Sequence, residues 1–548
     1  MKGKWNPSRS ISNMTLEERI SQLFMLGFDG NKMEEGLKEL LEELKPGGII
    51  IFSRNVASDK QLRELLAEAH EFYFKLTGTP LLISIDQEGG LVARIRKNFA
   101  VFPGNMALGA TYSTEKAYFV GKAIGEQLKW FRININLAPV IDIIVDKTNP
   151  SIGVRSFGDD PYLVSKLGRA MILGFKDSEI ISVAKHFPGI GAASIDPHMD
   201  LPVLEFPLKV IRSREFLPFI EAIEAGVDAI MPSHVLVSEI DEDLPASLSK
   251  KMIEGTLRGE LGFKGAILSD DLLMGAVSNR YSLEEASFLA LTAGEDMVLI
   301  CRDFEGQRSS IDFVVSAVKK GNLSKERVFE SLQRVMNLKL RALHVKPMDN
   351  PKLEQFFVLE REVCKESLTL IKFEEKCLPI RGIPSKITII CPERIKKLVN
   401  AGFSSLTLGE KIASRGIKVK EIFFEEERAD KVLKEAIEEL SDSEMVIIFT
   451  REILRYPKEA NLVRELIKFS NRKGIYLVAV SVGTPFDIEA FPEVKNYLAM
   501  YDYHEAMQET FVDVLFGRVK PEGKLPVSIQ GLFQRGFGII PEVWKNEG

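Results

Sequence analysis

The sequence predicts an α/β protein with an N-terminal (β/α)8 TIM-type barrel followed by a smaller α/β sandwich domain. Two observations lead to this fold class. Eight short apolar runs alternate with segments of helical period between residues 22 and 300, and five further runs follow after residue 385. Continuous apolar runs are typical of parallel strands covered on both faces, and eight βα units match a closed barrel. A doubly wound open sheet is the competing arrangement.

The eight predicted barrel strands are short and rich in aliphatic residues, many of them β-branched. They lie at 22–28, 47–53, 80–86, 135–143, 180–186, 227–234, 265–270 and 296–300. Helical period marks the connecting segments, most clearly at 60–76, 161–175 and 248–261. We therefore assign residues 1–345 to the catalytic barrel.

A turn-rich segment separates the two predicted domains. Two prolines, Pro347 and Pro351, flank an Asp-Asn pair, and we assign a linker to 346–364. Residues 365–548 form the predicted sandwich domain, whose turn-rich tail is expected to wrap back over another surface. Its five predicted strands lie at 386–391, 419–424, 445–450, 475–480 and 496–501.

Composition limits the class of protein. The chain has 548 residues, of which 45% are hydrophobic and 27% charged, as in ordinary globular proteins. With 72 basic and 78 acidic residues and no strongly basic stretch, a nucleic-acid partner is not expected. No run approaches the roughly 20 apolar residues of a membrane span, and residues 1–20 lack the apolar segment of a signal peptide. We expect a cytoplasmic enzyme without a membrane partner, and the sequence leaves its oligomeric state open.

Several predicted barrel strands end in ionisable residues. Asp86, Lys185 with His186, His234 and Asp270 each follow an apolar run. Because the carboxyl ends of barrel strands meet on one face, these groups are expected to form a polar ring there. Helix capping or loop hydrogen bonding explains any one of them alone, but explains four together less well.

The segment between Lys185 and Pro202 carries the densest set of such residues. Its GIGAAS stretch resembles a dinucleotide fingerprint, but Ser194 occupies the third small position and Pro197 interrupts the helix that a phosphate would need. Asp196 lies two residues before His198, where it can orient the imidazole and stabilise its cation. The loop therefore predicts acid/base chemistry, with a structural Asp–His turn as the alternative.

Metal and cofactor chemistry are not expected. Three histidines, His186, His198 and His234, fall on the predicted ring, but HxH and HExxH spacings are missing. The four cysteines include no CxxC pair and are expected to be reduced, mostly buried thiols. Because adjacent strand residues point to opposite sides, one of Asp270 and Asp271 should face the site while the other caps the next helix.

Five segments of the first 300 residues match a known family in order and spacing. They are IDQEGGLVARI (85–95), GVRSFGDDP (153–161), KHFPGIG…DPH (185–198), MPSHV (231–235) and LGFKGAILSDDLLMGA (261–276). Together they resemble glycoside hydrolase family 3. The similarity is greatest to the bacterial β-N-acetylglucosaminidases of the cell-wall-recycling type, over residues 15 to 300, and 513–529 is similar to the end of the sandwich domain in two-domain members.

The resemblance implies a role for each matching residue. Asp270 corresponds to the catalytic nucleophile, His198 to the general acid/base and Asp196 to the partner of that histidine. His234, on the same predicted ring, is assigned to substrate binding and is the next candidate for the acid. The other residues implied to bind the non-reducing sugar are Asp86, Arg94, Arg155, Lys185 and His186.

The implied reaction is the retaining, exo-acting removal of a terminal N-acetylglucosamine through a covalent glycosyl–Asp intermediate. The substrate would be a small carbohydrate, either an oligosaccharide or a muropeptide. Two departures from the family pattern, Ile190 for a histidine and Pro197 for a serine, remove no group that this chemistry needs.

Three other functions stay open at this point. Phosphorolysis could use the same residues, because a neutral histidine does not repel phosphate as a carboxylate would. A β-glucosidase of the same family is a second alternative, although the Asp-x-His loop favours N-acetylglucosaminides. An inactive sugar-binding scaffold is the third, and the presence of both Asp270 and His198 argues against it.

Overall fold

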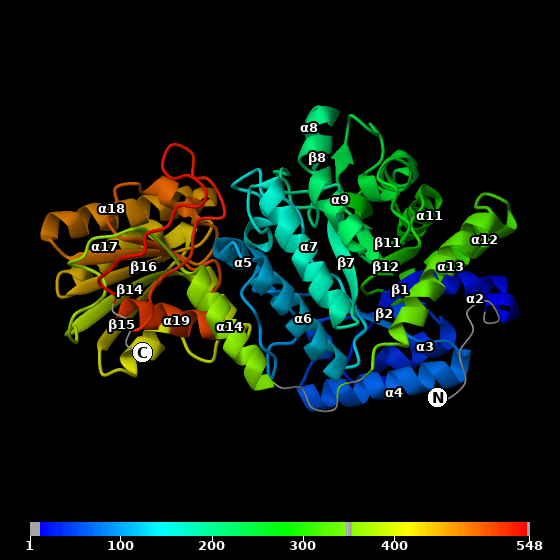
Figure 1. Ribbon diagram of the computed structural model, residues 1–548, viewed down its shortest axis with the longest axis horizontal. Coiled ribbons are helices and arrows are strands. Elements are labelled where there is room, and N and C mark those ends of the chain that lie inside the picture. Colours follow the sequence, from blue (N-terminus) through cyan, green and yellow to red (C-terminus); the bar gives the residue numbers. More distant parts are fainter. Residues whose placement is uncertain (1–10, 347, 349–352, 545–548) are drawn as a thin grey trace.

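The computed structural model describes residues 11–346, 348 and 353–544. Figure 1 shows two bodies, a barrel surrounded by helices and a sheet with helices on both faces, with α14 (Leu353–Ser367) between them. Within the described residues, no helix combines the length and apolar character that crossing a membrane requires.

Eight parallel strands close the N-terminal barrel in the order β1-β12-β11-β9-β7-β6-β3-β2, as the sequence predicts. Strands such as β2 are buried along their whole length, because helices cover the barrel outside and side chains fill it inside. The fourth strand is shorter than predicted, since Pro139 has no N–H to donate to a neighbour. The strands are β1 (Phe24–Gly27), β2 (Gly48–Ile51), β3 (Leu82–Ile85), β6 (Ile135–Asn136), β7 (Ile181–Phe187), β9 (Ala229–Pro232), β11 (Ala266–Asp271) and β12 (Met297–Ile300).

The helices around the barrel begin and end at residues suited to those positions. Ser58 starts α4 (Asp59–Thr77) with a reciprocal capping box, and Gly78 ends it in the left-handed conformation. The helix predicted at 248–261 is present as a wider π-type helix, η5 (Lys251–Glu260). The other long outer helices are α6 (Thr114–Trp130), α7 (Pro161–Asp177), α9 (Phe216–Ala225), α11 (Leu283–Ala293), α12 (Phe304–Lys319) and α13 (Lys325–Ala342).

Helix α14 occupies most of the segment predicted to be a linker. It packs against α5 (Asn105–Thr111) of the barrel and α19 (Glu505–Leu515) of the second domain. The helix forms because Phe356, Val363 and Cys364 give it a buried apolar face. Residues 347 and 349–352 of the predicted linker lie outside the described residues. The predicted boundary at 365 falls inside α14, and the domain limits stay a prediction.

The second domain contains a six-stranded sheet in the order β13-β18-β17-β16-β14-β15. Five strands match predicted runs, whereas β13 pairs antiparallel with β18 at one edge and was not predicted. Two buried clusters lie on opposite faces of the sheet, one beneath α17 (Ala429–Leu440) and α18 (Pro457–Lys473), the other beneath α19 (Figure 1). The strands are β13 (Thr369–Lys372), β14 (Lys386–Pro392), β15 (Lys418–Phe424), β16 (Met445–Thr450), β17 (Tyr476–Ser481) and β18 (Tyr497–Ala499).

The two domains share part of their core. Barrel residues Ile144 and Val154 belong to the same buried cluster as the α17–α18 face of the second sheet, and Leu91 packs against that cluster. The C-terminal tail also returns to the barrel, as predicted: Lys524 N donates to Ala110 O at 3.0 Å. The barrel loops that carry these residues are therefore covered by the second domain.

Candidate active site

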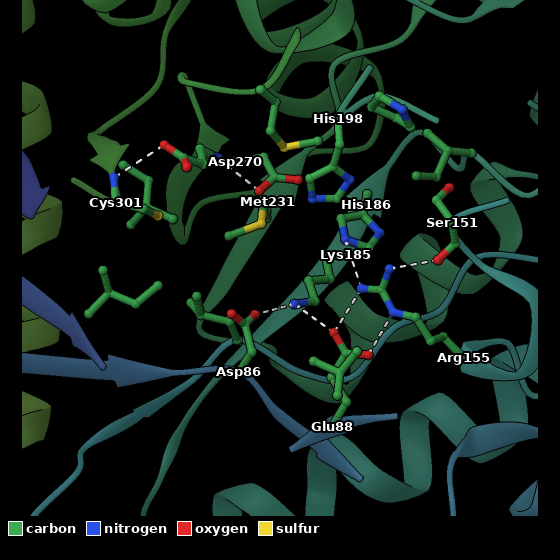
Figure 2. Close-up of a pocket in the computed structure, with 18 of the residues that line it drawn as sticks. Asp86, Glu88, Ser151, Arg155, Lys185, His186, His198, Met231, Asp270 and Cys301 are labelled. Carbon is green, nitrogen blue, oxygen red and sulfur yellow. Dashed lines mark hydrogen bonds and ion pairs between the residues drawn. The ribbon is translucent and has the colours of Figure 1, made fainter. Parts of the chain in front are cut away.

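A cavity of about 220 Å³ opens at the carboxyl ends of the barrel strands (Figure 2). It is smaller than the roughly 300–1,000 Å³ typical of pockets for drug-sized ligands, and therefore has room for one compact ligand group. All its described lining residues come from the barrel, between Ile50 and Cys301. The predicted residues that line it are Asp86, Arg94, Arg155, Lys185, His186, His198 and Asp270.

The floor of the cavity is a network of paired charges. Lys185, at the end of β7, donates to Asp86 Oδ1 at 2.7 Å and lies 2.9 Å from Glu88 Oε1. Arg155 forms a bidentate pair with Glu88 at 2.8 and 2.9 Å, and Arg94 donates to Asp86 Oδ2 at 3.1 Å. Three cations thus hold two carboxylates in fixed positions, and Figure 2 shows two of them, Lys185 and Arg155, beside Asp86 and Glu88.

The pKa values of these buried groups follow from the pairing. Burial favours the neutral carboxyl, but the charges of Lys185 and Arg94 outweigh it and hold the pKa of Asp86 far below its ordinary value. The same opposition, with Arg155 and Lys185 as the cations, lowers the pKa of Glu88 to about 2. Both carboxylates are therefore charged acceptors at neutral pH.

His186 is fixed from behind by Asp142. Its Nδ1 lies 2.8 Å from Asp142 Oδ2, and Asp142 also accepts the amide of Ile190 at 2.8 Å. The other ring nitrogen, Nε2, lies 3.5 Å from an Nη2 of Arg155. The imidazole edge that faces the cavity is thereby oriented.

His198 lies at the mouth of the cavity beside Asp196. Its Nδ1 is 2.8 Å from Asp196 Oδ1, and its backbone amide donates to the same oxygen at 3.0 Å. The His198 side chain is 64% exposed and that of Asp196 29%, so the pair faces the entrance. The hydrogen bond with Asp196 raises the pKa of His198 and lowers the pKa of Asp196. His198 is an ionisable group held ready to give or take a proton.

Asp270 and Asp271 end β11, and both border the cavity. Asp270 Oδ1 accepts the amide of Asp271 at 2.8 Å. The Asp271 carboxylate instead accepts the amides of Leu273 and Cys301, both at 3.2 Å, which ties it to the wall. This differs from the expectation for the pair, because both residues border the cavity and Asp271 does not cap the next helix, α10 (Gly275–Ser278), whose N-cap Met274 receives no side-chain capping hydrogen bond.

His234 lies behind the cavity wall and is not one of its lining residues. Its ring nitrogens lie 2.6 Å from Ser247 Oγ and 3.1 Å from the backbone oxygen of Asp271, so neither is turned toward a ligand. Burial lowers its pKa. The structure therefore separates His234 from the predicted sugar-binding residues, and its position suits support of the Asp270–Asp271 backbone.

Two residues of the site are not among the sequence predictions. Glu88 is two residues from Asp86, within the IDQEGG segment, and Asp142 lies inside the apolar run at 135–143. The rule that identified Asp86 and Asp270, an ionisable residue after an apolar run, misses Asp142 because three more apolar residues, 143–145, follow it. Among the described residues, no group of three or more His, Cys, Asp or Glu side chains is arranged to hold a metal ion.

Comparison with known proteins identifies the family. Residues 15–338 match the glycosyl hydrolase family 3 N-terminal domain, and residues 368–535 match the corresponding C-terminal domain. The chain belongs to glycoside hydrolase family 3. It is therefore a glycosidase with a carbohydrate substrate, and the predicted barrel-plus-sandwich architecture is that of family 3.

Individual family 3 proteins resemble the chain over different lengths. Beta-hexosaminidase A of Pseudoalteromonas piscicida is 28% identical over 90% of this chain and 91% of its own. A beta-hexosaminidase of Hydrogenovibrio crunogenus is 36% identical over 61% of this chain and 94% of its own. The structure of a family 3 beta-N-acetylglucosaminidase from Paenibacillus sp. FPU-7 superposes with a TM-score of 0.86 at 33% identity, over 94% of this chain and 99% of that one.

Proposed function

We propose that the protein is a retaining, exo-acting β-N-acetylglucosaminidase that removes N-acetylglucosamine from the non-reducing end of an oligosaccharide or muropeptide. The observation that carries the proposal is the His198–Asp196 pair at the mouth of a cavity that Asp270 also lines. A retaining glycosidase needs a nucleophile and a proton donor at the same glycosidic bond. The hexosaminidase names of full-length and barrel-length relatives support the substrate class.

In the first step, an Asp270 oxygen forms a bond to the anomeric carbon while the bond to the leaving oxygen breaks. The His198 imidazolium gives its proton to that oxygen. In the second step, neutral His198 takes a proton from water as the water oxygen attacks the anomeric carbon and Asp270 departs. Each carbon–oxygen bond that breaks is replaced by another, so His198 and Asp270 return to their starting states.

The charged network on the cavity floor would hold the sugar ring. Asp86 and Glu88 are acceptors, and Lys185, Arg155 and Arg94 are donors. Such pre-ordered groups bind hydroxyls without reorganising when the substrate arrives. We assign His186 to the same task, and His234 to support of the strand end behind Asp270.

Phosphorolysis is the second candidate, because the acid/base is a histidine rather than a carboxylate. The cavity cations argue against it: Lys185, Arg155 and Arg94 are each paired with a carboxylate, so little positive charge is left for phosphate. The structure of a beta-glucoside phosphorylase resembles this one with a TM-score of 0.79 at 20% identity, a likeness of fold alone.

A substrate panel tests the proposal. We expect the enzyme to hydrolyse N-acetylglucosaminides far faster than the matching glucosides, at a rate that added phosphate leaves unchanged. Proton NMR of the first product should show the β-anomer, which indicates retention. Sugar 1-phosphate as the main product would establish phosphorolysis, and a preference for glucosides would establish a β-glucosidase.

A further inference from the structure

The loop that carries His198 is bound to the segment that directly follows Asp270 and Asp271. We infer that Gly275 and Arg280, with Asn279, are positioning residues that hold His198 over the nucleophile. The inference rests on the proposed function, because it requires His198 to be the general acid. It adds a structural coupling between the acid/base loop and the nucleophile strand.

Backbone hydrogen bonds form the first part of this coupling. Gly275 N donates to His198 O at 3.1 Å, and Ala276 N donates to Pro197 O at 2.9 Å. Both donors belong to the first turn of α10 (Gly275–Ser278), which starts four residues after β11 ends. The acid/base loop is therefore fixed by backbone groups whose own position depends on the nucleophile strand.

Gly275 allows the two segments to approach this closely. A Cβ atom at Gly275 would lie 2.4 Å from Met199 O and 2.8 Å from His198 O. Both are backbone atoms, which cannot rotate away as a flexible side chain would, so any larger residue must displace the loop. A glycine is thus required here by the contact with the loop that carries the acid.

Side chains form the second part. Asn279 Nδ2 donates to Met199 O at 3.0 Å, and Arg280 Nη1 donates to Asp200 Oδ1 at 2.6 Å. The Arg280 and Asp200 side chains are 38% and 54% exposed, so the pair lies outside the hydrophobic core, and replacing Arg280 should leave core packing intact. Together the four contacts hold residues 197–200 against 275–280.

The coupling has a specific consequence for the chemistry. Loosening the loop should impair proton donation to the leaving group while leaving Asp270 and the sugar-binding network in place. Substrates with poor leaving groups need that proton, whereas activated aryl glycosides do not. Loss of positioning is therefore distinguishable from general damage to the protein.

The test compares kcat/KM for chitobiose and for 2,4-dinitrophenyl N-acetylglucosaminide in Gly275→Ala and Arg280→Met. A displacement near 1 Å can cost about a hundredfold, so we expect a loss of that order for chitobiose with Gly275→Ala. The activated substrate should stay within about threefold of the wild type. Arg280→Met should show the same selectivity with a smaller loss, and Arg280→Lys should restore the rate.

Matched controls separate positioning from folding. Gly255→Ala places a Cβ where no atom lies within 4 Å, and Arg212→Met removes an exposed ion pair with Glu260. Both should keep wild-type rates on both substrates. If Gly275→Ala and Arg280→Met match these controls while His198→Ala loses the unactivated substrate selectively, the coupling is refuted and the proposed function stands. If His198→Ala itself lacks that selectivity, the acid assignment and the coupling both fall.

Discussion

Asp142 accepts hydrogen bonds from the backbone amide and from the ring Nδ1 of His186, at 3.2 and 2.8 Å. Because the guanidinium of Arg155 can only donate, the ring nitrogen that faces it accepts and the proton lies on Nδ1. The carboxylate of Asp142 thus fixes both the orientation and the tautomer of a histidine in the sugar-binding network.

The Asp142→Asn variant tests this relationship. Whichever carboxylate oxygen the asparagine replaces with NH2, a donor then faces a donor: the amide of Ile190 in one orientation, or the amide and Nδ1 of His186 in the other. A buried mismatch of this kind costs about 1–3 kcal/mol, roughly five- to 150-fold in kcat/KM. Steady-state kinetics measure the loss, with Asp241→Asn as the control, because Asp241 is also a buried carboxylate but does not line the cavity. An unchanged kcat/KM in the folded variant would show that the hydrogen bonds accepted by Asp142 are not needed for sugar binding.

The pH profile of kcat/KM reports on the His198–Asp196 pair. Donation to the leaving group requires protonated His198, so activity is lost as pH rises through the pKa of that residue. The hydrogen bond with Asp196 raises this pKa. Asp196→Asn should therefore move the alkaline limb of the profile to lower pH for an unactivated substrate. If the alkaline limb lay at the same pH in wild type and Asp196→Asn, the limb would report the ionisation of a group other than His198.

Substitutions of Asp270 and Asp271 should have unequal effects. Asp270→Ala removes the proposed nucleophile and should reduce kcat by about four orders of magnitude or more. Asp271→Asn keeps the oxygen that accepts the amides of Leu273 and Cys301, so its loss should stay within about tenfold. Circular dichroism confirms that each variant is folded. Comparable losses in both variants would contradict the assignment of Asp270 alone as the nucleophile.

The Glu88 carboxylate should stabilise the folded protein in a pH-dependent way. Glu88→Gln leaves Arg155 and Lys185 without one of their two buried counter-charges, which costs about 3 kcal/mol or more of unfolding free energy near neutral pH. Because the folded-state pKa of Glu88 is lowered to about 2, its contribution is complete above the ordinary value of 4.5 and is lost as pH falls toward 2.

Denaturant unfolding of wild type and Glu88→Gln at several pH values measures this difference. The two curves should converge as the pH falls below 4.5. Glu17→Gln, which removes an exposed ion pair with Lys319, serves as the control and should change stability little at any pH. A stability difference that stays constant with pH would show that the carboxylate charge is not its source.

The sequence predicts the barrel well because each strand is a local signal, a short apolar run with a polar residue at its end. It predicts the positions of Asp86, Lys185 and Asp270 at one face for the same reason. It does not predict α14, since Pro347 and Pro351 suggest a turn and the apolar face of the helix becomes meaningful only when two domains cover it.

The sequence also does not predict contacts between segments that are far apart in the chain. His234 follows an apolar run like the others, but its ring is turned toward Ser247 and away from the cavity. The pairing of Glu88 with Arg155, 67 residues later, depends on how two segments far apart in the sequence meet. Local sequence patterns indicate which end of the barrel carries the site residues, whereas tertiary packing decides the direction of each side chain.

The core shared between the domains means that the second domain also packs against segments near the cavity. Leu91 follows the strand that carries Glu88, and Val154 precedes Arg155; both are held by apolar residues of the C-terminal half. A chain cut after the barrel would expose this apolar face to solvent, next in sequence to two residues of the charged cavity floor. We therefore expect sugar affinity to depend on domain docking, so a fragment lacking the second domain would need this surface redesigned before its catalysis could be compared with that of the whole enzyme.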